Sequence, residues 1–149
     1  MTLSHRGREG DADMKDDEKK TIIIELPYPV SGNRYWRKVG GRVVLSAAAK
    51  KYRSIVKSIA MCNGITGANG MGARRVKVTR VFYQPDKRVR DMGNHTKVLD
   101  DALTLAGVWN DDGQIDDERN LRGIGPSRVI VRIEEADNKG LDLDKLIYG

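Results

Sequence analysis

Residues 76–112 read VKVTRVFYQPDKRVRDMGNHTKVLDDALTLAGVWNDD, and this stretch decides the fold. Val76 to Tyr83 is rich in β-branched and aromatic residues and alternates only imperfectly, which predicts a strand at or near the centre of a sheet. After Pro85-Asp86 and a basic run, apolar residues recur at helical spacing up to Gly107, which fits a C-terminal stop. Asn94 is the predicted N-cap of this helix, and its apolar face consists of Val98, Leu99, Ala102, Leu103, Leu105 and Ala106.

Three further elements are predicted upstream of this stretch. Thr21 to Leu26 is β-branched and ends at Pro27, which indicates a buried strand. Arg42 to Leu45 is a short strand after a Gly40-Gly41 turn. Ser46 has the position of an N-cap before a helix whose buried stripe is Tyr52, Ile55, Val56, Ile59 and Ala60. Since 149 residues suffice for one domain with its own core, we predict an α/β (α+β) fold, a single small domain with a mixed β-sheet and two main helices.

A basic and aromatic segment follows the first predicted strand and its proline-containing loop. It consists of Arg34, Tyr35, Trp36, Arg37 and Lys38. Its cations and rings suit a surface that holds phosphates and stacks on bases. The same pattern also suits an exposed hairpin strand whose aromatic side chains cover the core, and both interpretations stay open.

Acidic residues gather in one part of a basic chain. The formal net charge of +6 and a pI near 9.5 point towards nucleic acid or an anionic surface as partner. Yet eight of the 21 acidic residues lie between Asp91 and Glu118. Because carboxylates repel phosphate, such a cluster is explained if a divalent cation lies between it and the nucleic acid. The pattern indicates metal-dependent chemistry on nucleic acid.

Asp91 lies between the predicted central strand and the helix after it, a position at which functional sites gather. Asn94, Lys97 and Asp101 share one face of that helix, next to Asp91. Lys97 and Asp101 are also spaced as an ordinary i,i+4 ion pair, which is the favoured interpretation for Asp101. Asp111-Asp112 follows the helix, whose length would not by itself return this acidic pair to Asp91. Their convergence therefore depends on tertiary packing.

Composition excludes several classes of protein. Cys62 is the only cysteine, which excludes an intramolecular disulfide and a cysteine-rich zinc site, and we expect it to be buried or half-buried. No apolar run reaches the roughly 18 residues of a membrane span, and residues 1–20 lack the hydrophobic segment of a secretory signal. An EF-hand is rejected, because Gly113 at its sixth position would put Val108 and Arg119 where acidic ligands are required. We expect a cytoplasmic protein with a charged, disordered tail over residues 1–20.

Short motifs follow one another in a specific order along the chain. They are Leu26-Pro27, Asn33-Arg34-Tyr35, Pro85-Asp86, Arg90-Asp91-Met92-Gly93-Asn94 with Lys97, Asp101-Ala102-Leu103, Ala106-Gly107, Trp109, and Asp111-Asp112 with Gln114. Each motif is weak alone, whereas the ordered set with its spacing is specific. The set covers most of Thr21 to Glu135 and resembles the RusA family of Holliday junction resolvases, the crossover junction endodeoxyribonucleases of bacteria and their prophages.

The resemblance implies a small α/β homodimer that binds four-way DNA junctions. It would hydrolyse phosphodiesters by paired, symmetric nicks with Mg²⁺ as cofactor, during DNA recombination and repair. The endonuclease domain would occupy residues 21–149. Because a junction offers two equivalent strands, a two-fold dimer would place one site on each.

The resemblance also implies roles for particular residues. Asp91 and Asp112, with Asp111 beside it, would bind the metal, which would polarise a phosphodiester oxygen and lower the pKa of the attacking water. Asp91, Asp112 and Lys97 would be catalytic, with Lys97 offsetting charge as it develops on the phosphate. A group of cations would hold the DNA and make binding salt-sensitive, namely Arg34, Lys87, Arg88 and Arg90.

Gly93 departs from the family pattern, which commonly has a further aspartate at this position. Mg²⁺ needs only one or two protein carboxylates, so binding remains possible. The number of metals stays open, as does whether Asn94 or Asp101 joins the site. Two other functions remain as alternatives, a non-catalytic protein that binds junctions or other DNA and a Mg²⁺ nuclease that acts on flaps or other branched DNA.

Overall fold

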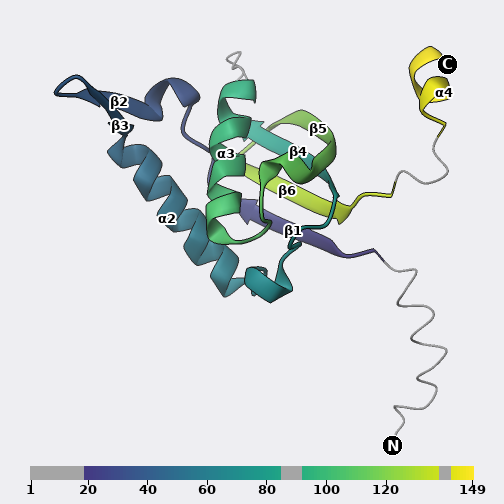
Figure 1. The fold of residues 1–149 in the computed structure, drawn as a ribbon. Coiled ribbons are helices and arrows are strands. Elements are labelled where there is room, and N and C mark those ends of the chain that lie inside the picture. Colours follow the sequence, from purple (N-terminus) through teal and green to yellow (C-terminus); the bar gives the residue numbers. More distant parts are fainter. Residues whose placement is uncertain (1–18, 85–91, 138–141) are drawn as a thin grey trace, which may run out of the picture.

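The computed structural model describes residues 19–84, 92–137 and 142–149 (Figure 1). Its strands are β1 (Thr21–Leu26), β2 (Trp36–Val39), β3 (Arg42–Leu45), β4 (Val76–Gln84), β5 (Ile115–Ile124) and β6 (Arg128–Glu135). Its helices are α2 (Ala47–Cys62), α3 (Met92–Ala106) and α4 (Leu143–Tyr148), with 3-10 turns η1 (Gly32–Arg34), η2 (Gly67–Asn69) and η3 (Asp112–Gln114). Within the described ranges, no helix is long and apolar enough to cross a membrane.

Four of the strands form one mixed sheet in the order β1-β6-β4-β5. β6 runs antiparallel to both of its neighbours, whereas β4 and β5 are parallel and α3 connects them. The prediction of a near-central strand at Val76 to Tyr83 is confirmed, because β4 has a partner on each side. β2 and β3 pair with each other in a separate hairpin that extends from the body of the molecule (Figure 1).

The core lies on the face of the sheet that α2 and α3 cover (Figure 1). β1 buries every second side chain and leaves Ile23 exposed on its other face, the alternation expected of a strand with one covered side. The largest fully buried side chains include Trp109, Phe82, Leu26, Met71, Leu99 and Leu103. A mixed sheet with two main helices is therefore confirmed, and α4 is a further short helix among the described residues.

The observed ends of α2 and α3 can be compared with the caps predicted from the sequence. Ser46 is the N-cap of α2, and its Oγ accepts a hydrogen bond of 3.1 Å from the backbone N–H of Ala49. Gly107 follows α3 with a φ of 84°, a conformation that glycine adopts without strain. The predicted N-cap at Asn94 is wrong, because α3 begins at Met92 and Asn94 lies within its first turn.

Two expected burials are also wrong. The sequence pattern predicts that Leu105 lies on the apolar face of α3, but its side chain is 58% exposed. It follows Leu103 by two residues, which places it on roughly the opposite side of a helix with about 3.6 residues per turn. Cys62 is exposed at the last position of α2, beyond the stripe that packs on the core.

Candidate functional site

Lys97 and Asp112 meet at the surface of α3. The Lys97 Nζ lies 3.3 Å from Oδ1 of Asp101, one turn along the helix, and 3.6 Å from Oδ2 of Asp112 in η3. The predicted i,i+4 pair is confirmed, and the contact with Asp112 is one that spacing alone did not predict. The carboxylates of Asp101 and then Asp112 raise the pKa of Lys97, which therefore stays protonated at neutral pH.

Gln114 holds the acidic turn in place. Its buried side chain accepts hydrogen bonds from the backbone N–H groups of Asn110 (3.1 Å) and Asp111 (2.9 Å). Its amide nitrogen donates to the carbonyls of Gly72 (2.8 Å) and Arg74 (2.6 Å), just before β4. Gln114 therefore connects two segments by hydrogen bonds: the turn that contains Asp112, and the residues just before the central strand β4. In the sequence Gln114 is recognisable only as part of a motif, and its spacing does not predict this structural role.

The glycine-rich connection before β4 packs against the end of α3. A Cβ atom at Gly70 would lie 2.6 Å from the carbonyl oxygen of Val108 and 2.9 Å from that of Ile65, both backbone atoms. The neighbouring backbone N–H of Met71 donates to the Val108 carbonyl at 2.7 Å. Only glycine permits this approach, which sets the path of the chain as it leaves α3 towards Asp112.

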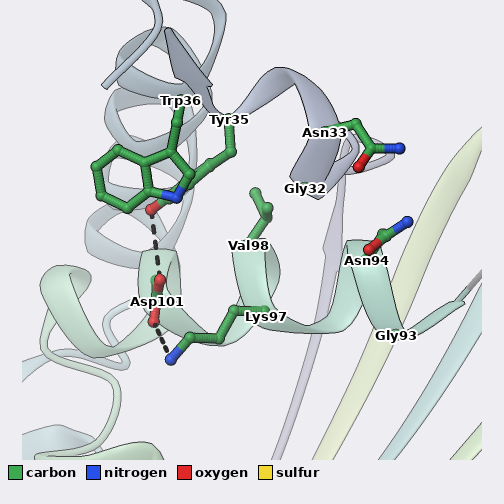
Figure 2. Close-up of a pocket in the computed structure, with 9 residues that line it drawn as sticks. All are labelled: Gly32, Asn33, Tyr35, Trp36, Gly93, Asn94, Lys97, Val98 and Asp101. Carbon is green, nitrogen blue, oxygen red and sulfur yellow. Dashed lines mark hydrogen bonds and ion pairs between the residues drawn. The ribbon is translucent and has the colours of Figure 1, made fainter. Parts of the chain in front are cut away.

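A pocket of about 240 Å³ lies between the start of the hairpin and α3 (Figure 2). On the hairpin side it is lined by Gly32, Asn33, Tyr35 and Trp36, and on the helix side by Gly93, Asn94, Lys97, Val98 and Asp101. A Cβ atom at Gly32 would lie 3.2 Å from the backbone oxygen of Asn94, so a small residue at this point lets η1 approach the first turn of α3. Asn94, Lys97 and Asp101 share one helix face, as predicted, and that face opens into the pocket.

Tyr35 links the hairpin to α3 and α2. It is 3% exposed, its hydroxyl donates to Oδ2 of Asp101 at 3.4 Å, and it accepts a hydrogen bond from Arg53 of α2. Burial raises the pKa of the Tyr35 phenol, so its hydroxyl remains a donor. Asp101 is thus fixed by Tyr35 on one oxygen and contacts Lys97 through the other. A continuous chain of polar contacts therefore runs from Arg53 to Asp112.

The two aromatic side chains of the basic and aromatic segment lie in different environments. Tyr35 covers the core, whereas Trp36 is 55% exposed at the start of β2. The two rings meet edge to face, with centroids 5.2 Å apart and an interplanar angle of 89°. The segment therefore combines a buried structural aromatic with an exposed one at the pocket.

A buried ion pair that the sequence pattern did not predict joins β4 to α3. Arg80 of β4 is fully buried and donates two hydrogen bonds to the carboxylate of Asp100, at 2.8 and 3.2 Å. Its remaining nitrogen donates to Glu118 (2.7 Å) and Asn120 (2.9 Å) of the neighbouring β5. One feature of the sequence could have predicted this pair: each of the two elements has a charged residue at an inward-facing position. Arg80 lies among the buried valines of β4, and Asp100 lies beside Leu99 in α3.

Asp100 is expected to make stability depend on pH. Burial raises the pKa of its carboxyl to about 6 from 3.8, against the opposing charge of Arg80. The folded chain therefore binds more protons than the unfolded chain between about pH 4 and 6, and its free energy of unfolding falls as the pH rises through that window. Asp100→Asn does not titrate, so the difference between wild type and this variant should decline by about 3 kcal/mol across the window, at about 1.4 kcal/mol per pKa unit.

Urea unfolding of both proteins at a series of pH values, with EDTA present, measures this difference. A difference that grows with rising pH would contradict the assignment of a raised pKa to Asp100. The result does not depend on cleavage activity, so it tests the buried pair separately from the surface site.

Comparison with known proteins identifies the family. The family model described as endodeoxyribonuclease RusA matches residues 27–134. The chain belongs to the RusA family. The crossover junction endodeoxyribonuclease RusA of Escherichia coli (strain K12) is 40% identical over 106 residues, which cover 68% of this chain and 82% of that protein. The enzyme of the same name from Enterobacteria phage HK97 is 37% identical over 115 residues, which cover 76% of this chain and 93% of that protein.

A solved structure adds little to this assignment. A DegV lipid-binding protein from Thermotoga maritima has a TM-score of 0.37 and 15% identity, over 92% of this chain and 50% of that chain. A likeness this weak supports neither a shared fold nor a shared function.

The RusA match includes every residue that sequence analysis assigned to the site. Asp112 is half-buried beside Lys97, whereas Asp111 is exposed and its carboxylate lies against Gly113, where a Cβ atom would approach it to 2.8 Å. Arg34 is exposed in η1. The remaining assigned residues lie outside the described residues, namely Asp91, Lys87, Arg88 and Arg90. Within the described ranges, no group of three or more His, Cys, Asp or Glu side chains is arranged to hold a metal.

Proposed function

We propose that this chain is a crossover junction endodeoxyribonuclease that resolves Holliday junctions by paired, symmetric nicks. The observation that carries the proposal is the approach of Lys97 to Asp112 within the segment that the RusA family model matches. The cation and the carboxylate come from a helix and from the turn after it, and Lys97 also lines an open pocket. This combination suits phosphodiester hydrolysis better than DNA binding alone, because a carboxylate opposes phosphate binding unless it holds a metal.

Mg²⁺ is the proposed cofactor, with Asp112 and Asp91 as its main ligands and Asp111 as a further one. The carboxylate of Asp112 fits this ion, because it supplies hard oxygen ligands and is half-exposed, so that bound waters can complete the coordination. An ion bound there supplies charge neutralisation at the scissile phosphate and lowers the pKa of the attacking water.

Lys97 is proposed to contact the phosphate. Its protonated ammonium has three N–H donors, and a phosphate oxygen that gains charge during hydrolysis is stabilised by such a donor. Asp101 holds Lys97 at 3.3 Å and is itself fixed by Tyr35. Asp101 is therefore proposed as a positioning residue, because each of its oxygens contacts a neighbouring side chain.

Gly93 bears on the number of metals. Asp101 already contacts Lys97 and Tyr35, so we favour the amide of Asn94, which lines the same pocket as Gly93, to replace the carboxylate expected at position 93. A neutral amide oxygen is a weaker ligand for Mg²⁺ than a carboxylate. We infer that one metal is held strongly in each site.

DNA is proposed to be held by Arg34, Lys87, Arg88 and Arg90, and by symmetry in a homodimer. Each phosphate contact releases counterions, so binding should weaken steeply as salt rises. A two-fold dimer would place one site on each of the two equivalent strands of a junction, which accounts for paired nicks. The proposed catalytic domain is residues 21–149, with the preceding residues as a tail.

A synthetic four-way junction tests the function. Incubated with the protein and Mg²⁺, it should yield two symmetric nicks in strands of like polarity, and EDTA should abolish them. Binding without any nick would instead favour a non-catalytic junction-binding protein. Faster cleavage of a flap than of the junction would favour a nuclease for other branched DNA. Sedimentation of the protein alone should give the mass of a dimer.

A further inference from the structure

We propose that the pocket between the hairpin and α3 takes one unstacked nucleobase of the DNA substrate, next to the phosphodiester that is cut. This inference rests on the proposed function and names the part of the substrate that the site recognises. It is carried by an exposed aromatic wall and by two asparagines at the opposite end of the pocket (Figure 2). It is also carried by Lys97, which lines the pocket and contacts Asp112.

Trp36 supplies the aromatic wall. Its ring touches Tyr35 edge to face, so Tyr35 does not stack on the indole. The side chain remains 55% exposed, whereas the other tryptophan of the chain, Trp109, is 1% exposed in the core. A half-exposed indole beside a pocket is a platform on which any base can stack, because every base has a π-face.

Asn33 and Asn94 supply the polar end. Both residues line the pocket, on the side away from Trp36 and Tyr35 (Figure 2). Neither amide makes a side-chain hydrogen bond to another described residue. Each offers one acceptor and two donors, the set with which Asn reads the edge of a base. The pocket thus has groups for both the face and the edge of a base.

The size and position of the pocket select one base. Its volume of about 240 Å³ is below the roughly 300–1,000 Å³ of pockets for drug-sized ligands, so it suits a single ring system better than a dinucleotide. Lys97 lines this pocket and also contacts Asp112. A base bound there therefore belongs to a nucleotide next to the phosphate at Lys97.

Such a base must leave the stack, which costs least where strands exchange at a junction and stacking is already interrupted. Exposed cations adjoin the aromatic wall, with Arg34 in η1 and Arg37 and Lys38 on β2. They can hold the phosphates on either side of the unstacked nucleotide, the combination found in proteins that bind single strands.

A chemical double-mutant cycle tests the proposal. The nick made by the wild type is mapped first, and the nucleotides flanking it are then replaced one at a time by an abasic residue. At saturating junction, Trp36→Ala should slow cleavage roughly 5- to 150-fold, the range for loss of one base stacked on an aromatic side chain. An abasic residue at the correct position should slow the wild type by a similar factor and should have little further effect on Trp36→Ala. Independent, multiplying effects at both flanking positions would overturn the proposal.

Two variants control for structure. Trp36→Phe retains an aromatic face and should recover most of the rate. Val39→Ala removes exposed apolar surface from the far end of the same strand and should cleave like the wild type. All three variants should match the wild type in thermal midpoint. A loss of rate with Val39→Ala as large as with Trp36→Ala would show that the hairpin acts through its shape alone.

Binding without cleavage separates this proposal from the proposed function. In EDTA, a 2-aminopurine base placed beside the nick should be quenched by the wild type and not by Trp36→Ala, whether or not the protein cleaves. If no junction is cleaved but quenching still depends on Trp36, the pocket stands and the nuclease function fails. If the wild type cleaves and quenching is the same in both proteins, the pocket proposal fails and the function stands.

Discussion

Asp112→Asn is expected to abolish cleavage of four-way junctions while junction binding in EDTA persists. The substitution retains the shape of the side chain and removes the charge that attracts the proposed Mg²⁺. Metal ions contribute several kcal/mol of charge stabilisation in such reactions, so the rate should fall by at least about 100-fold. Single-turnover cleavage of a labelled junction measures the rate, and gel mobility in EDTA measures binding.

Asp117→Asn is the matched control, because it removes one exposed carboxylate from the same acidic stretch. It should cleave at nearly the wild-type rate. A wild-type rate in Asp112→Asn would refute the assignment of Asp112. An equal loss in both variants would indicate that net charge in the stretch matters, and not one metal ligand.

Arg80→Met is expected to lower the free energy of unfolding by about 3–5 kcal/mol at pH 8, the usual cost of removing one partner of a buried ion pair. Arg80 is fully buried, and its loss leaves the carboxylate of Asp100 in the core without its counter-charge. The cost should shrink at lower pH, where Asp100 can take up a proton. Urea unfolding at pH 8 and at pH 5 measures both effects.

The double variant Arg80→Met with Asp100→Leu should recover most of that loss, since an apolar pair of similar size leaves no buried charge. Arg75→Met serves as an exposed comparison, because Arg75 pairs with Asp116 at the surface. It should leave the unfolding free energy nearly unchanged. If Arg80→Met is as mild as Arg75→Met, the buried network does not carry the stability assigned to it.

Much of the fold was predictable because local sequence patterns determine these elements. The strand Thr21 to Leu26 and the helix after Ser46 follow from β-branched runs, caps and helical spacing, and the structure confirms them. The Lys97–Asp101 pair follows from spacing along one helix. Family membership was predictable as well, because the order and spacing of several motifs lie in the sequence itself.

Contacts between elements were harder to predict. Lys97 reaches Asp112 only because the chain turns sharply after α3 and Gln114 fastens the turn, which no spacing rule encodes. The pair of Arg80 and Asp100 was missed because each residue, taken in its own element, resembles an interruption of an apolar pattern. The two residues can be recognised as an ion pair only when β4 and α3 are packed together.

Gln114 also has an evolutionary consequence. Its amide uses both of its donor hydrogens and both acceptor positions on four backbone groups, so even glutamate, the nearest substitute in shape, would leave two carbonyls facing an acceptor. Selection should therefore retain glutamine here as strictly as it retains a catalytic aspartate, although the side chain touches no substrate. A ranking of positions by invariance alone would count Gln114 among the chemical groups of the site, whereas its task is to fix the distance between two segments of chain.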